Sequence, residues 1–203
     1  MQAAAITHSG TEDISQQEIK ELITPAQSSC GESVVLFSPQ KLIDLCEICY
    51  RAQSVSRILL LKKKLDFSSK DEISEAAKDL DFSDFITKDK TFRVTCERHG
   101  NHDFTSQDIE EDIGGQIDGK VDLKNPDIIV YAYIYNSGCY IGIDFAGFDL
   151  SKRHYRIFNY KSQLRATMAY SLLRMAGYKR SSTLVDPFCG SGTIIIEAAL
   201  FAC

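Results

Sequence analysis

The residues of this chain whose types and spacing point most directly to chemistry form one octapeptide near its end. An apolar run, residues 183–185, precedes it, and residues 194–200 follow with an apolar helical pattern. The order of strand, glycine turn and helix start lets a backbone close tightly around a nucleotide-like ligand. We therefore predict that this segment is a ligand-binding loop, formed by Asp186, Pro187, Phe188, Cys189, Gly190, Ser191, Gly192 and Thr193.

The residues around the two glycines discriminate between ligand classes. A Walker phosphate loop needs a lysine after its last glycine, but Thr193 and Ile194 follow here. The dinucleotide fingerprint needs a small residue where Ile195 stands. The remaining ligand is S-adenosylmethionine, whose zwitterionic amino-acid part would lie against the glycine backbone while Asp186 faces its ammonium or sulfonium group. A lone G-x-G would favour a ligand-free tight turn, but the complete octapeptide is much more specific.

Other patterns that suggest chemistry have weaker support. Cys46 and Cys49 form a single C-x-x-C inside a predicted amphipathic helix, which is more often core packing than zinc or redox chemistry. His99 and His102 lack a matching cysteine or histidine pair, so we predict no metal site. Cys189 is expected to pack in its loop rather than to act as a nucleophile.

The composition is that of an ordinary soluble protein, with 44% hydrophobic and 25% charged residues in 203. No apolar stretch reaches the ~18 residues that a membrane span needs, and Glu12 and Asp13 argue against a secretory signal. Seven cysteines without a regular framework indicate reduced thiols. We therefore expect a cytoplasmic protein, monomeric and without a membrane partner.

The charge is distributed unevenly along the chain. Residues 1–150 carry 15 Lys and Arg against 26 Asp and Glu, whereas residues 151–180 carry eight cations and no acid. Such a segment is expected either to face phosphate or to be a solvated basic linker. Both interpretations stay open. The eight cations are Lys152, Arg153, Arg156, Lys161, Arg165, Arg174, Lys179 and Arg180.

Hydrophobic periodicity predicts a small α+β unit at the N-terminus, of ferredoxin-like type. Its strands are expected at residues 3–7, 33–37 and 55–61, the last turned by the basic run 62–64. Its helices are expected after Thr11 and at about residues 40–52.

A second unit is predicted to follow, with a helix after Ser69 and a strand at 91–96. The next helix begins at Thr105, which forms a capping box with Asp108. A hairpin at 128–145 turns at residues 136–138. Residues 164–175 have the period of a helix, and Ser181 and Ser182 introduce the apolar run before the glycine loop.

The octapeptide resembles motif I of S-adenosylmethionine-dependent methyltransferases that act on exocyclic amino groups of bases. The preceding hundred residues resemble the THUMP domain, an RNA-binding module of tRNA- and rRNA-modifying enzymes. The whole chain is similar to the THUMP-containing RNA guanine-N2 methyltransferases, most weakly in residues 1–90. The segments that carry the THUMP resemblance are residues 92–94, 98–106, 113–114, 120–127, 142–144 and 149–156.

The resemblance implies an arrangement of domains and a set of RNA contacts. It implies a ferredoxin-like domain at 1–67, THUMP at 68–150, a basic linker at 151–180 and the start of a Rossmann-like α/β methyltransferase domain at 181–203. RNA is expected to be held through shape and phosphate contacts. The implied RNA-binding residues are Arg98, His99, His102, Lys120, Lys124, Arg153 and Arg156, each of which would singly be interpreted as a surface cation.

The chain departs from the family pattern in ways that limit these expectations. The catalytic Asn/Asp-Pro-Pro-Tyr element of the family is absent from the sequence. We therefore expect a truncated chain that is inactive in methyl transfer by itself. Relatives often show Ala-Pro-Leu-Lys where this linker has residues 162–165. The resemblance implies a linker contact to the donor at Leu164 or Thr167.

Three functions compete at this stage. The first is a guanine-N2 methyltransferase of tRNA, which we favour, or of ribosomal RNA. The second is a non-catalytic THUMP module that presents RNA to a partner. The third, a THUMP-bearing thiouridine synthase, would need a Ser-Gly-Gly pyrophosphatase loop, which is absent.

Overall fold

The computed structural model describes residues 1–157 and 163–203. The chain forms two compact units. Unit 1 comprises Met1–Ala4 and Leu59–Gly147, and unit 2 comprises Ala5–Ile58 and Phe148–Cys203. The fold combines helices with mixed sheet, which confirms the predicted mixture of α and β elements, and the predicted arrangement of domains stays a prediction. Within the described ranges, no helix is long and apolar enough to cross a membrane.

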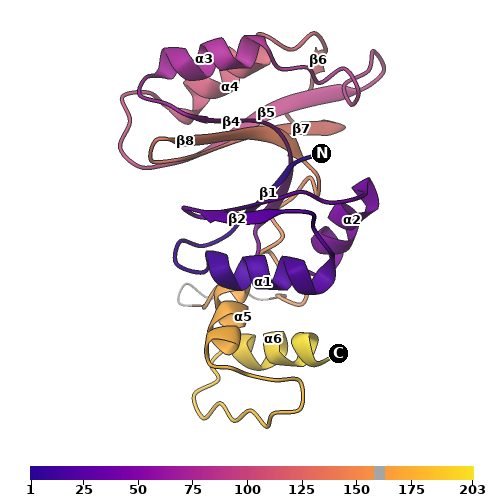
Figure 1. Ribbon diagram of the computed structural model, residues 1–203, viewed down its shortest axis with the longest axis vertical. Coiled ribbons are helices and arrows are strands. Elements are labelled where there is room, and N and C mark those ends of the chain that lie inside the picture. The colour runs from indigo at the N-terminus through magenta and orange to yellow at the C-terminus, as the bar shows by residue number, and fades with distance from the viewer. Residues whose placement is uncertain (158–162) are drawn as a thin grey trace. The chain divides into compact units, whose positions relative to one another are not determined.

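Unit 1 is a mixed sheet with the strand order β4-β8-β7-β5-β6, and two helices lie against one of its faces (Figure 1). β4 with β8 and β8 with β7 are antiparallel pairs, whereas β5 is parallel to both β7 and β6. The elements are β4 (Arg57–Asp66, whose first two residues belong to unit 2), α3 (Lys70–Lys78), β5 (Thr91–His99), α4 (Ser106–Gly114), β6 (Lys120–Val121), β7 (Ile128–Tyr135) and β8 (Gly138–Asp144).

The helix α4 connects the parallel strands β5 and β7, and the sequence specifies its start. Thr105 accepts a hydrogen bond from the backbone N–H of Asp108, and the Asp108 carboxylate accepts one in return from the N–H of Thr105, at 2.7 Å. The predicted capping box is therefore confirmed. Ile109 and Ile113, one turn apart, are buried and form the apolar face of the helix.

The strand β4 is longer than the sequence indicates. The prediction that the basic run 62–64 turns the chain is wrong, because β4 continues to Asp66. A register shift between Leu61 and Lys63 lets the strand remain paired with β8. The ammonium groups of Lys62 and Lys64 lie over the rings of Phe85 and Tyr140, 5.5 and 5.9 Å from their centroids. The lysine stems thus cover aromatic surface.

Unit 2 joins N-terminal strands and helices to the two helices at the end of the chain. Its strand order is β2-β3-β1, and β2 with β3 is an antiparallel hairpin. The sequence pattern missed β2 because its four residues are small, polar and mostly exposed. The elements are β1 (Ala3–Ile6, shared with unit 1), α1 (Glu12–Leu22), β2 (Ser28–Gly31), β3 (Val34–Phe37), α2 (Leu42–Arg51), α5 (Ala166–Met175) and α6 (Thr193–Ala202).

The strand expected at residues 183–185 is not formed. Among the described residues, no strand pairs with this segment, and the Val185 side chain is 79% exposed. A parallel strand exists only when neighbouring strands satisfy its backbone groups, so apolar residues alone do not create one. The helix predicted to follow the glycine loop is confirmed as α6.

Candidate cofactor site and RNA surface

The segment 186–193 forms a tight turn that leads directly into α6. Gly190 and Gly192 have φ angles of +53° and +74°, which favour glycine. The Gly192 N–H donates to the Cys189 carbonyl at 2.7 Å, and the Gly192 carbonyl accepts from Ile196 at 2.9 Å as the first helical bond. The first N–H groups of a helix have no intrahelical partner, so this turn points backbone donors and the positive end of the α6 dipole outward.

A cavity of about 480 Å³ opens in front of this turn. Its volume falls within the range of small-molecule sites. The Asp186 carboxylate lies on the wall and accepts a hydrogen bond from the Phe188 N–H at 3.1 Å. Phe188 is 93% exposed, so its ring covers nothing in unit 2. The described lining residues are Gln163, Leu164, Asp186, Phe188, Cys189, Gly190, Ser191, Thr193 and Ile194.

The linker supplies the opposite wall of the cavity through Gln163 and Leu164. Of the two suggested linker contacts, Leu164 lines the cavity whereas Thr167 is fully buried and hydrogen bonded to His8 Nε2 at 2.8 Å. The guanidinium of Arg156 donates to the Leu164 carbonyl at 2.6 Å and to Thr193 Oγ1 at 3.4 Å. Arg156 therefore connects the two walls.

A buried polar cluster holds α6 behind the cavity. The Glu197 side chain is 0% exposed and pairs with Arg153, which is 13% exposed, at 3.1 Å. Its carboxylate also accepts from Tyr155 at 2.7 Å and from the Gln53 amide at 2.8 Å. Burial, together with the Glu197 carboxylate, raises the pKa of Tyr155 to about 12. This cluster joins three segments of unit 2 that are distant in sequence.

The turn that carries Gln53 is itself anchored by a second buried carboxylate. Glu18, on α1, accepts hydrogen bonds from the backbone N–H groups of Gln53 and Ser54 at 2.8 and 2.9 Å. Complete burial raises the pKa of Glu18 above its usual value. Neither carboxylate is among the residues predicted from the sequence. For Glu197, a signal exists, since it is the single charged residue of the otherwise apolar α6.

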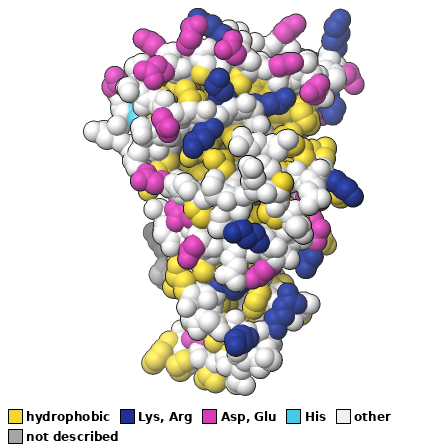
Figure 2. All heavy atoms as spheres, in the orientation of Figure 1, with side chains coloured by type: hydrophobic (Ala, Val, Ile, Leu, Met, Phe, Trp, Pro, Cys, Tyr) yellow, Lys and Arg dark blue, Asp and Glu magenta, His cyan; other side chains and the backbone are white. Residues whose placement is uncertain are grey.

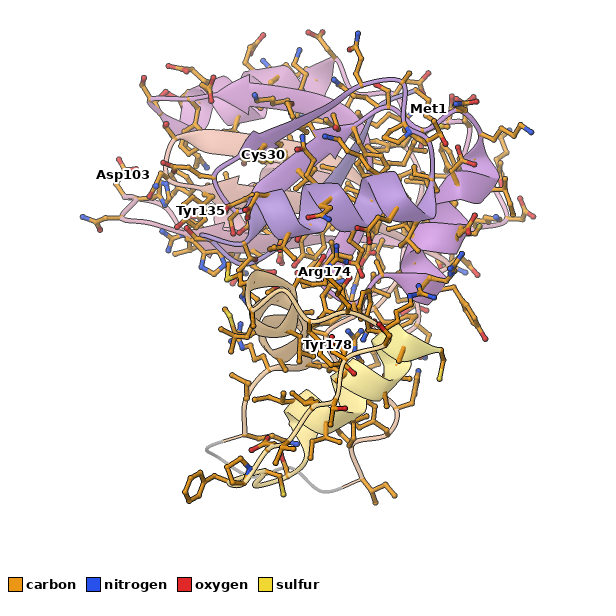
Figure 3. All side chains as sticks on the ribbon, turned by 60° about the horizontal axis from the view of Figure 1, so that its bottom comes forward. Met1, Cys30, Asp103, Tyr135, Arg174 and Tyr178 are labelled. Carbon is orange, nitrogen blue, oxygen red and sulfur yellow. The ribbon has the colours of Figure 1, made fainter. Side chains whose placement is uncertain are left out.

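The described residues of the basic segment 151–180 do not form a continuous charged face. Arg153 also donates to the carbonyls of Leu150 and Gln53, at 2.7 and 2.8 Å, so its guanidinium is engaged inside unit 2. Arg174 forms two bonds with Glu21, at 2.6 and 2.9 Å, and Figure 3 shows it on α5. Lys161 and Ser162 lie outside the described residues. The exposed members are Lys152, Arg165, Lys179 and Arg180.

Two of the predicted RNA-binding residues lie together at one end of unit 1. Arg98 donates to His102 Nδ1 at 3.0 Å, and His102 Nε2 donates to the Asn136 carbonyl at 2.7 Å. These partners fix the tautomer of His102, which therefore fastens its loop to the β7–β8 turn. Arg98 lies over the Phe104 ring at 5.7 Å, and its buried Nε has no partner among the described residues. Asp103 and Tyr135, labelled in Figure 3, mark this end.

The remaining predicted RNA residues of unit 1 lie on β5, on β6 and just after β6. His99, at the same end as Arg98, is exposed and contacts Glu97 at 2.9 Å. Lys120 pairs with Thr91 at the other end of the strand, and Lys124 follows it, also exposed. Nine residues of strand separate the two ends by about 26 Å. The structure therefore brings Arg98 and His102 into contact, whereas His99 lies at the same end on the opposite face of β5 and the two lysines lie apart from all three.

The helical face of unit 1 is acidic. Figure 2 shows Asp and Glu side chains gathering over α3 and α4. Polyanions are repelled by such a face. Where the structure describes the chain, no group of three or more His, Cys, Asp or Glu residues could hold a metal ion.

Comparison with known proteins identifies two domain types in this chain. The family model of the THUMP domain matches residues 67–144, and the model of the RMKL-like methyltransferase domain matches residues 153–203. The chain thus combines a THUMP domain with sequence of an RMKL-like methyltransferase domain.

Individual relatives refine this assignment. The chain is 33% identical to the tRNA (guanine(6)-N2)-methyltransferases of Archaeoglobus fulgidus and Methanocaldococcus jannaschii, with 94% of this chain and 51% and 54% of theirs covered. It is 28% identical to the ribosomal RNA large subunit methyltransferase K/L of Dichelobacter nodosus, over 95% of this chain and 28% of that protein. The chain spans about half the length of the first two.

A solved structure has the same fold. TrmN from Thermus thermophilus is 26% identical, with a TM-score of 0.74 over all of this chain and 62% of that one. The similarity covers both the sheet-bearing parts and the segment that carries the glycine turn.

Proposed function

We propose that this chain supplies the donor-binding turn and the RNA-binding THUMP domain of a protein that transfers a methyl group from S-adenosylmethionine to the N2 amine of a guanine in tRNA. The observation that carries this proposal is the cavity at the glycine turn, lined by Asp186 and by a helix N-terminus. Those groups suit a ligand with both an anionic and a cationic end. The two relatives named as tRNA (guanine(6)-N2)-methyltransferases support the reaction and the substrate.

The residues of the turn fit the amino-acid part of the methyl donor. Gly190 and Gly192 allow the backbone to approach the ligand closely, and the outward N–H groups at the start of α6 suit its carboxylate. Asp186 would pair with the ammonium group and orient the methionine part. Pro187, Phe188, Cys189, Ser191 and Thr193 complete the proposed binding segment. The donor supplies an electrophilic methyl group, and no covalent enzyme intermediate is required.

The RNA contacts that we propose lie on unit 1. Arg98, His99 and His102 lie near one end of β5, and Lys120, followed in the chain by Lys124, pairs at the other end, about 26 Å away. Two separated cationic groups suit a folded RNA that is held by its phosphates and its shape. Arg153 and Arg156, expected from the sequence to join this set, have contacts inside unit 2 that favour a structural role.

The reaction needs groups that hold the acceptor amine. The lone pair of guanine N2 is delocalised into the ring, so acceptors must orient the amine toward the methyl group. The Asn/Asp-Pro-Pro-Tyr element that does this in the family is absent from these 203 residues. We therefore propose that this chain by itself binds the methyl donor and RNA but does not transfer the methyl group. We also propose that the target base leaves its stack to react, at a cost of about a few kcal/mol.

The domain arrangement is part of the same proposal. Residues 1–67 would form a ferredoxin-like domain, 68–150 the THUMP domain, 151–180 a linker and 181–203 the start of a Rossmann-like methyltransferase domain. The THUMP match at residues 67–144 supports the second range. The methyltransferase match begins at residue 153, within the proposed linker, and β4 of the first range pairs with β8 of the second. Cytoplasmic RNA would be the partner.

The test is methylation of unmodified tRNA and rRNA transcripts by the intact protein with labelled donor, followed by mass spectrometry of the nucleosides. We expect N2-methylguanosine in tRNA and none in rRNA. Product in rRNA alone would favour the ribosomal branch, to which the Dichelobacter nodosus relative belongs. RNA binding without product in either pool would leave the non-catalytic THUMP module as the better account.

A further inference from the structure

Arg156 occupies an unusual place for a residue of a basic linker. Its terminal nitrogen donates to the Leu164 carbonyl at 2.6 Å and, more weakly, to Thr193 Oγ1 at 3.4 Å. Leu164 and Thr193 lie on the two walls of the cavity at the glycine turn. The one guanidinium therefore bridges the linker wall and the first residue of α6.

The side chain of Arg156 is partly withdrawn from solvent. The residue is half-buried, and its Nε is buried and has no hydrogen-bond partner in the described part of the chain. Lys152 of the same segment is, in contrast, exposed to any polyanion. Burial thus separates Arg156 from the surface cations of the same segment.

The neighbours of Arg156 hold it in this position. Arg153 and Tyr155, one to three residues earlier, both contact the buried Glu197 carboxylate, at 3.1 and 2.7 Å. Glu197 lies one helical turn after Thr193 in α6. The segment that carries Arg156 is therefore fastened to the same helix whose first residue Arg156 contacts.

We propose that Arg156 is a positioning residue for the methyl donor: it fixes Thr193 and Leu164 relative to each other and so sets the width of the cavity. The inference rests on the proposed function. Both bonds come from Nη2, whose two N–H groups are fixed in the guanidinium plane, whereas the three donors of a lysine ammonium rotate freely and do not fix a direction. A phosphate contact, in contrast, tolerates lysine, because it depends mainly on charge.

The experiment measures the affinity of the intact protein for S-adenosylhomocysteine by calorimetry and for tRNA by filter binding at several salt concentrations. The variants are Arg156→Ala, Arg156→Lys and Thr193→Val, with Lys152→Ala as the control from the same segment. We expect both Arg156 variants to weaken S-adenosylhomocysteine binding about tenfold, the loss typical of a hydrogen bond from a charged group. The salt dependence of tRNA binding should stay unchanged, and Lys152→Ala should leave the ligand affinity unchanged.

Thr193→Val tests whether Arg156 acts through that hydroxyl. Its effect on ligand binding should not add to that of Arg156→Ala, because both remove one contact. Melting temperatures separate positioning from loss of fold. Thr193→Val and Arg156→Lys are conservative and should melt within about 4 °C of the wild type.

Each result assigns a role. Unchanged ligand affinity in both Arg156 variants would overturn the inference while leaving the proposed function intact. A tRNA salt slope reduced by about one in Arg156→Ala and restored in Arg156→Lys would make Arg156 a phosphate contact instead. If the wild type itself bound no S-adenosylhomocysteine, the proposed function would fail before the inference was reached.

Discussion

Replacing Arg153 by methionine tests whether the basic linker is a structural clamp or an RNA-binding surface. The change keeps most of the apolar stem but leaves the Glu197 carboxylate, 0% exposed, without its cationic partner. Removing one member of a buried ion pair costs about 3–5 kcal/mol, because the remaining charge stays desolvated. For a protein of this size that corresponds to a fall in melting temperature of roughly 6–20 °C.

The assay is urea unfolding at pH 7, followed by circular dichroism, with Lys152→Met as an exposed control. The control should change the free energy of unfolding by no more than about 0.5 kcal/mol. Adding Glu197→Gln to Arg153→Met should recover much of the lost stability, since a neutral amide needs no counter-charge and can still accept from Gln53. If Arg153→Met lowered the free energy of unfolding by less than about 1 kcal/mol, as for a surface ion pair, the structural role of the Arg153–Glu197 pair would be refuted.

Three further predictions follow from single contacts. Gly142→Ala would place a Cβ 2.4 Å from the Leu60 carbonyl oxygen, so urea unfolding should show a loss of about 1–3 kcal/mol. Gly192→Ala forces a side chain into a φ of +74°, which costs a strain of about 1–2 kcal/mol. Calorimetry should therefore show weaker binding of the methyl donor. Unchanged binding would contradict the proposal that this turn holds the donor. The Arg174 hydrogen bond lowers the pKa of Glu21, so its stabilisation is present above the unfolded pKa and lost as pH falls through the folded one. In urea titrations at pH 7, the free energies of unfolding of the wild type and Glu21→Gln should differ by at most about 1 kcal/mol, because Glu21 is 45% exposed. The difference should shrink below about pH 4. A difference that stays constant with pH would contradict this prediction.

The features that the sequence predicted well depend on neighbouring residues. The glycine turn before α6 needs only backbone freedom at Gly190 and Gly192, and the capping box of α4 needs Thr105 and Asp108 three residues apart. Such short-range patterns can be recognised from the amino-acid sequence alone. For the same reason, the hairpin of β7 and β8 was predicted within one residue at either end.

The features that the sequence could not give depend on distant partners. Glu197 meets Arg153 and Gln53 across 44 and 144 residues, and no local pattern reports such a pair. The cluster of charges along the linker therefore suggested that Arg153 contacts RNA. Its pairing with the buried Glu197 carboxylate favours a structural role instead. The strand at 183–185 failed for a related reason, because a strand is defined by its neighbours as well as by its own residues.

The central claim is that the turn of Gly190 and Gly192 holds the methyl donor. The most direct measurement is a crystal structure of the intact protein with S-adenosylhomocysteine. The account predicts the amino-acid part of the ligand against the turn, its carboxylate at the N-terminus of α6 and its ammonium within hydrogen-bond distance of Asp186. Ligand density elsewhere in the protein, with this cavity empty, would contradict it.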